Sequence, residues 1–120
     1  MAKVLVVDDS SLLRTVLCDY LRDLGHEPLA ASTPVEAIAL CASHRPDLVI
    51  KDLIMKDTNP TALMKDLRRH RSDLPIVICS TSGMRREIRD ALHAGADDFL
   101  IKPFSRHDID VLIRRHVIPV

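Results

Sequence analysis

The chain has 120 residues, of which 47% are hydrophobic, and its 17 basic residues balance 17 acidic ones to give a formal net charge of zero. This length fits one domain, here residues 1–120, that buries roughly two-thirds of its unfolded surface, and the balanced charge argues against direct nucleic-acid binding. No apolar run reaches about 18 residues, the length needed for a membrane-spanning helix, and the chain does not begin with a signal-peptide pattern. We therefore expect a cytoplasmic protein without membrane contacts.

Short apolar runs typical of buried strands alternate along the chain with segments in which apolar residues recur at helical spacing. In chain order we predict strand 1–9, helix 10–24, strand 27–31, helix 34–43, strand 47–52, helix 60–71, strand 74–82, helix 84–94, strand 99–102 and helix 106–118. Strands that alternate with helices in this way indicate an α/β domain, in which helices cover both faces of a doubly wound parallel sheet.

Local signals mark several of the predicted helix ends. Gly25 supplies a left-handed stop to the first helix, and Thr33-Pro34-Val35-Glu36 is a capping box with proline in the first turn. We interpret Asn59-Pro60 as the cap and first-turn pair of the third helix. Ser105-Arg106-His107-Asp108 is a capping box for the last helix, which ends before Pro119.

The cysteines agree with a reducing compartment. Cys18, Cys41 and Cys79 each lie inside an apolar periodic segment, and no C-x-x-C spacing occurs. Because cytosolic proteins seldom form disulfides and cysteine in such segments packs as a small hydrophobic residue, we expect three buried, reduced thiols.

Three of the predicted strands end in charged residues. Asp8 and Asp9 end the first, Asp52 ends the third and Lys102 ends the fifth. In open α/β sheets the functional crevice lies outside the carboxyl ends of the strands, so these side chains are expected to lie together. Neighbouring carboxylates raise one another's pKa unless a cation offsets them, and Mg²⁺ prefers such oxygen ligands, commonly together with a phosphoryl oxygen. The pattern therefore predicts a magnesium site.

Four motifs, in order along the chain, carry a resemblance to a known family. They are Val7-Asp8-Asp9-Ser10, Asp47-Leu48-Val49-Ile50-Lys51-Asp52, Pro75-Ile76-Val77-Ile78-Cys79-Ser80 and Gly95-Ala96-Asp97-Asp98-Phe99-Leu100-Ile101-Lys102-Pro103-Phe104. Together they resemble the receiver domain of two-component response regulators, of the chemotaxis-regulator type, over the whole chain. The resemblance implies a flavodoxin-like receiver fold with five helices and strand order 2-1-3-4-5.

The resemblance also implies the chemistry of the site. Asp52 would be the phosphoacceptor, which takes a phosphoryl group from a histidine kinase or a histidine phosphotransfer protein. Asp9 and Asp52 would ligate Mg²⁺ directly, with Asp8 acting through water and the backbone carbonyl of Ile54 adding another oxygen. The Lys102 ammonium would neutralise charge on the phosphoryl oxygens. Such a domain assists its own phosphorylation and dephosphorylation and is not otherwise an enzyme.

The implied output is a relay to a downstream protein or a fused output domain. Ser80 would donate its hydroxyl to the phosphoryl group and move toward it, and Phe99 would rotate into the space left behind. This would reshape the surface made by the fourth helix, the fifth strand and the fifth helix. Thr81 would border the approach of the hydrolytic water, and the Lys102-Pro103 peptide bond is expected to be cis, as in the family.

Some positions depart from the usual receiver pattern. Lys56 stands where receivers usually have proline, and with Asp57 it makes the turn beside the expected metal site charged and flexible. Pro60 lies near a usual glycine, and Thr81 replaces a usual alanine or glycine. Strand alternation puts Lys51 on the sheet face away from the phosphoacceptor, where residues are normally apolar, and we expect it to extend outward to solvent.

Three other interpretations stay open. A receiver that no longer switches would serve only as a protein-interaction module; Lys56 and Thr81 favour this, whereas the intact acids oppose it. A Mg²⁺-dependent aspartyl phosphatase also carries a strand-end aspartate, but its nucleophile and acid normally lie two residues apart, whereas Asp8 and Asp9 are adjacent. A flavodoxin-like nucleotide binder would need a Ser/Thr/Gly phosphate loop after the first strand, where this chain has acids that repel phosphate.

Overall fold

The computed structural model describes residues 1–56 and 58–117, so Asp57 and Pro119, which enter the predictions above, lie outside the described residues. The elements are β1 (Lys3–Val7), α1 (Ser11–Asp23), β2 (Glu27–Ala31), α2 (Pro34–His44), β3 (Leu48–Asp52), α3 (Ala62–His70), β4 (Ile76–Thr81), α4 (Arg85–His93), β5 (Asp98–Lys102) and α5 (Arg106–His116). Within this part of the chain, no helix combines the length and the apolar character needed to cross a membrane.

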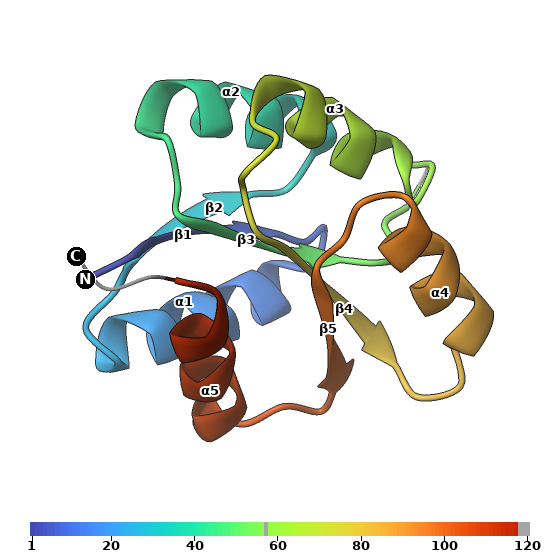
Figure 1. Cartoon of the computed structure of the whole chain (residues 1–120). Helices are drawn as coiled ribbons and strands as arrows, with labels where there is room; N and C mark the ends of the chain where they lie inside the picture. The colour runs from blue at the N-terminus through green and yellow to red at the C-terminus, as the bar shows by residue number, and fades with distance from the viewer. Residues whose placement is uncertain (57, 118–120) are drawn as a thin grey trace.

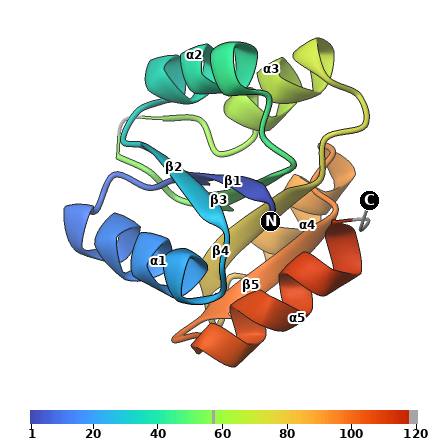
Figure 2. The same cartoon turned by 90° about the vertical axis from the view of Figure 1, so that its left-hand side faces the viewer.

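The five strands form one parallel sheet in the order β2-β1-β3-β4-β5, which confirms the predicted fold class and strand order. The helices make two outer layers (Figures 1 and 2): α1 and α5 cover one face of the sheet, and α2, α3 and α4 cover the other. The three inner strands, β1, β3 and β4, are covered on both faces and buried over almost all of their length, which is why they appear in the sequence as nearly continuous apolar runs. The edge strands β2 and β5 are only partly buried.

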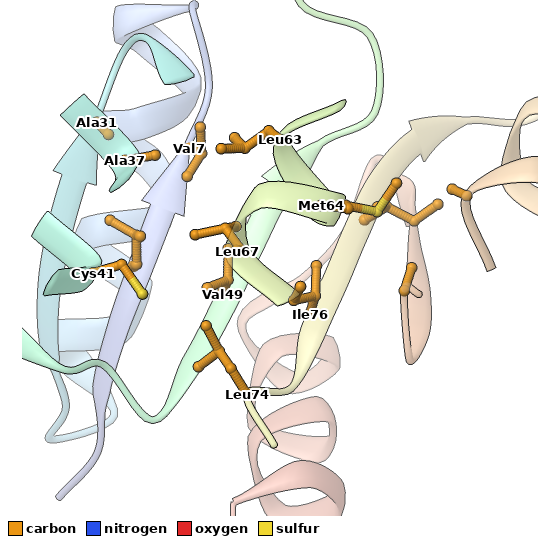
Figure 3. Close-up of a cluster of buried hydrophobic side chains, with 14 of the residues drawn as sticks. Val7, Ala31, Ala37, Cys41, Val49, Leu63, Met64, Leu67, Leu74 and Ile76 are labelled. Carbon is orange, nitrogen blue, oxygen red and sulfur yellow. The ribbon is translucent and has the colours of Figure 1, made fainter. Parts of the chain in front are cut away.

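Strand alternation divides the core into two clusters of buried side chains. In the larger one (Figure 3), residues of α2 and α3 such as Cys41 and Leu67 pack against Val7, Val49 and Ile76 of the sheet. The other cluster joins α1 and α5 to the opposite side chains of the same strands. The three cysteines are buried and free, as expected.

The capping signals are confirmed in full at α5 and in part at α2, and they are wrong at α3. Ser105 and Asp108 exchange both bonds of a capping box. At α2 the Glu36 N–H donates to the Thr33 hydroxyl, but the Glu36 carboxylate accepts from the Ser32 N–H and not from the Thr33 N–H, so only half of the predicted box forms. The third helix does not begin at Asn59-Pro60; α3 begins at Ala62, after Thr61. The Asn59 side-chain oxygen accepts from the Thr61 N–H at 2.9 Å, so it closes a local turn before the helix and caps nothing.

Candidate functional site

The register of the sheet aligns the ends of four strands at one edge. Val7 lies opposite Lys51, Asp52 opposite Cys79, and Thr81 opposite Lys102. β1 and β4 end at Val7 and Thr81, sooner than the strand predictions 1–9 and 74–82, so the two adjacent acids lie in the loop after β1. The residues that follow or end these strands therefore share one crevice.

Three carboxylates meet in that crevice. One oxygen from each of Asp8, Asp9 and Asp52 lies within 4.8 Å of the other two. Asp8 is buried, Asp52 is half-buried and Asp9 is exposed, so the cluster opens to solvent on one side. Hard carboxylate oxygens at this spacing are the donor set that Mg²⁺ prefers, and the predicted acids fit such an ion.

Asp8 is held by hydrogen bonds to both its backbone and its side chain. Its N–H donates to the Ala31 carbonyl at 3.1 Å, its carboxylate accepts from the Ser10 N–H at 2.9 Å, and its carbonyl accepts from the Arg14 guanidinium at 2.7 Å. Burial raises the pKa of Asp8, an effect that the Ser10 hydrogen bond opposes and the negative charge of Asp52 reinforces. Burial therefore disfavours the charged form of Asp8 in the folded chain, and a cation in the crevice would offset that cost.

Asp9 is held by a turn that is distant in sequence. The backbone N–H of Lys56 donates to the Asp9 carboxylate at 2.8 Å, across 47 positions of the chain. A proline at this position could not make the bond, because proline has no N–H. Lys56 thus links the loop after β1 to the loop after β3, a contact that the sequence analysis missed and that no local pattern encodes.

Lys102 pairs with the Asp52 carboxylate. Its Nζ lies 2.9 Å from Asp52 Oδ1, and both side chains are largely buried, 20% and 11% exposed. Although burial acts to lower it, the hydrogen bond and charge of Asp52 raise the pKa of Lys102, which keeps the ammonium charged. The Lys102-Pro103 peptide bond is cis, as predicted. Phe104 then packs edge-on against Tyr20 of α1, with ring centroids 6.4 Å apart, so the loop after Lys102 is anchored to a helix.

Ser80 is buried at the end of β4 with its hydroxyl unused. It is 2% exposed, and in the described part of the chain its Oγ is a buried polar atom without a hydrogen-bond partner. A buried hydroxyl without a partner costs about 1–3 kcal/mol, so its retention at this edge is consistent with a ligand oxygen that arrives only at times.

The remaining predicted residues lie around the crevice or beyond it. Thr81 is exposed, and Ile54, whose carbonyl is the predicted metal ligand, is 44% exposed. Phe99 is 43% exposed and lines a surface groove with Ile88 of α4 and Ile101 of β5, so it lies on the predicted output surface and not in the core.

Lys51 differs from its prediction. Alternation does point it away from the carboxylates, but the outward extension to solvent is wrong: the side chain is 1% exposed. Its Nζ turns back to the carbonyls of Asp52 and Leu53, at 2.6 and 3.4 Å. The signal available in the sequence was a lysine inside an otherwise apolar strand, which has no reason to be there unless its amino group finds partners.

Comparison with known proteins agrees with this architecture. Residues 4–114 match the family described as the response regulator receiver domain. The chain is 33% identical over 104 residues to the chemotaxis protein CheY of Bacillus subtilis, covering 86% of this chain and 87% of that protein. It is 34% identical over 112 residues to the probable transcriptional regulator ycf27 of Porphyra purpurea; this match covers 93% of the chain but spans only 46% of that relative.

Solved structures give the same result. The chemotaxis protein CheY4 of Vibrio cholerae superposes with a TM-score of 0.91 at 29% identity, covering 98% of this chain and 99% of that one. NtrX of Brucella abortus superposes with a TM-score of 0.91 at 30% identity, but the match takes up 96% of this chain and 26% of the other. The fold, the three-carboxylate crevice and these matches lead to one conclusion: the chain belongs to the response regulator receiver family of two-component signalling.

Proposed function

We propose that this receiver domain, over residues 1–120, is a phosphorylation-dependent switch in which Asp52 accepts a phosphoryl group from a histidine kinase or a histidine phosphotransfer protein. The observation that carries the proposal is the convergence of Asp8, Asp9 and Asp52 within 4.8 Å beside the Lys102 ammonium. Two further features support it: the orphaned Ser80 hydroxyl at the same edge and the family of the chain.

The transfer needs positioning and charge neutralisation more than covalent assistance. An Asp52 oxygen attacks phosphorus, and the bond from phosphorus to the donor's histidine nitrogen breaks with its electron pair left on nitrogen. Lys102, which already contacts Asp52 Oδ1, faces the incoming oxygens with a fixed positive charge. Mg²⁺, held by the three acids and the Ile54 carbonyl, would supply the remaining neutralisation of phosphoryl charge.

The output proposed is a change in the surface formed by α4, β5 and α5. Once the phosphoryl group is in place, the free Ser80 hydroxyl donates to one of its oxygens and moves toward it. Phe99, now exposed in the groove against Ile88 and Ile101, turns inward to fill the space that Ser80 leaves. A partner protein would bind this groove with different affinity in the phosphorylated and unphosphorylated states. A receiver without switching is disfavoured, because it would keep the buried Asp8 carboxyl and the unpartnered Ser80 hydroxyl, both unfavourable to bury, without using them.

The direct test is phosphorylation by acetyl phosphate, followed by intact-protein mass spectrometry. We expect one phosphoryl adduct per chain with Mg²⁺ present and almost none after the metal is removed with EDTA. Equal incorporation in both conditions, or none in either, would contradict the proposal.

We also expect a long phosphoryl lifetime, set by Thr81. Thr81 is exposed beside Lys102, and its β-branched side chain is stiff at χ1, so it obstructs the water that must approach opposite Asp52. Thr81→Ala should therefore lose its phosphoryl group up to about tenfold faster, which corresponds to about 1.4 kcal/mol of barrier. The measurement is the decay of the purified phosphoprotein at saturating Mg²⁺.

Thr81→Ser is the matched control, because it keeps the hydroxyl and removes the branch. If both variants decay faster, the obstruction is steric. Decay of Thr81→Ala no faster than the parent would refute the steric argument, and slower decay would mean that the hydroxyl holds the water in place.

A further inference from the structure

Lys51 has an environment that the function proposed above does not use. Its side chain leaves β3 on the face covered by α2, α3 and α4, where its register partners Val7 and Ile78 and its neighbours Val49 and Leu53 are fully buried. With 1% of its surface exposed, it is among the largest fully buried side chains of the protein. Burying an amino group among apolar side chains is unfavourable unless the group is paired, so its partners explain its presence.

Those partners are backbone carbonyls next to the phosphoacceptor. The Lys51 Nζ donates to the Asp52 carbonyl at 2.6 Å and lies 3.4 Å from the Leu53 carbonyl. Both carbonyls lie where β3 gives way to the turn that leads to Ile54 and Lys56. Burial lowers the pKa of Lys51 to about 8, while the negative charges of Asp52 and Asp8 oppose the shift. The amino group donates to carbonyls in either protonation state, so its role as a tether does not depend on its charge.

The turn that Lys51 contacts carries several parts of the site. It begins at Asp52, continues through the Ile54 carbonyl, and reaches the Lys56 N–H that holds the Asp9 carboxylate at 2.8 Å. The rigid proline typical of receivers is absent at Lys56, so the conformation of the turn must be fixed in another way. A buried donor on two successive carbonyls fixes the backbone at the start of the turn.

We propose that Lys51 is a positioning residue that fixes the turn after β3 and so presents Asp52, the Ile54 carbonyl and the Lys56 N–H in one arrangement. The inference rests on the proposed function, because that function explains why the turn would need to be fixed. The rigidity of the turn can be measured independently of the function. Outer-shell contacts of this kind commonly change metal affinity by 10–100-fold when they are removed.

The test uses Lys51→Met, which keeps an unbranched side chain that is one heavy atom shorter and suited to a buried apolar site, and which removes the donors. The first measurement is amide hydrogen exchange in the metal-free protein by NMR. We expect the Leu53 and Lys56 amides, which donate to the Cys79 carbonyl and to Asp9, to exchange about tenfold faster relative to the most protected core amides. The second is the Mg²⁺ dissociation constant by calorimetry, expected to rise about tenfold.

Ile78→Val is the matched control, because Ile78 is the register partner of Lys51 and its truncation loosens the same core without touching the carbonyls. It should change neither measurement. Lys51→Gln, which retains a shorter neutral donor, serves as a second variant and should fall between the parent and Lys51→Met.

The outcomes separate the inference from the function. Unchanged exchange at Leu53 and Lys56 in Lys51→Met overturns the inference whether or not the parent binds Mg²⁺. Equal or tighter Mg²⁺ binding by Lys51→Met also overturns it, because the amino group would then act only as a competing positive charge. A parent chain that neither binds Mg²⁺ nor accepts a phosphoryl group refutes the function, while the exchange result still decides the role of Lys51.

Discussion

Asp52→Asn should abolish phosphorylation by acetyl phosphate at saturating Mg²⁺. The amide that replaces the carboxylate is a poor nucleophile, and the substitution also removes one of the three clustered metal-ligand candidates and the partner of Lys102. Among the described residues, Asp52 is the carboxylate that pairs with Lys102, so we expect no other acid to take its place. Mass spectrometry of the intact protein, with peptide mapping of the adduct in the parent, measures both the amount and the position of the phosphoryl group.

Asp47→Asn is the control for this experiment. Asp47 precedes the same strand at its opposite end, where it accepts from the Lys3 N–H at 2.8 Å, so it shares the strand but not the crevice. It should be phosphorylated like the parent. An undiminished adduct on Asp52→Asn would show that the phosphoacceptor is a different residue.

Asp8→Asn should make the metal-free protein more stable and largely remove its response to Mg²⁺. Burial raises the pKa of Asp8, which means that the charged form is disfavoured in the folded state; a neutral amide removes that penalty and can still accept from the Ser10 N–H. We expect the free energy of unfolding to rise by about 0.5–2 kcal/mol, the usual range for one stabilising substitution. Phosphorylation by acetyl phosphate would also fall, because the site loses one of its three acids.

Thermal unfolding followed by circular dichroism, with EDTA and with Mg²⁺, measures both effects. A ligand at 100 times its dissociation constant stabilises a protein by about 2.7 kcal/mol, so the parent should gain several degrees with Mg²⁺ and Asp8→Asn should gain little. Asp19→Asn, at an exposed position on α1, should behave like the parent in both conditions. A variant that melts below the parent without metal, or that keeps the full gain with it, would disprove the account of Asp8.

The fold could be predicted because its signals are local and repeated. Each inner strand is a largely apolar run, and the turns and caps around it, such as the box at Ser105 and Asp108, need only neighbouring residues. The start of α3 was mispredicted because Asn59 has two local options, to cap a helix or to close a turn on Thr61, and the sequence does not rank them.

The positions of the site residues could be predicted where they depend on strand ends. They could not be predicted where they depend on contacts between distant loops or on the path of a long side chain. Register alone brings Asp52 and Lys102 to one edge, and both follow visible apolar runs. The Lys56 N–H to Asp9 bond joins backbone to side chain across two loops, and any residue except proline could make it. The path of Lys51 depends on whether a long side chain continues outward or turns back, which alternation does not specify. The structure places these residues but does not test what they do, so the roles of Asp52, Lys102 and the other site residues stay predictions.

The packing of Phe104 on Tyr20 gives the protein an internal optical probe. The chain has one tyrosine and no tryptophan, so its intrinsic fluorescence comes from a single ring on α1. That ring meets Phe104, two residues after Lys102, and lies 5.7 Å from the Arg106 guanidinium at the start of α5. A movement of the Lys102 loop toward the crevice would change the environment of the Tyr20 ring. Binding and phosphorylation at the crevice can therefore be followed by the tyrosine fluorescence of the unlabelled protein.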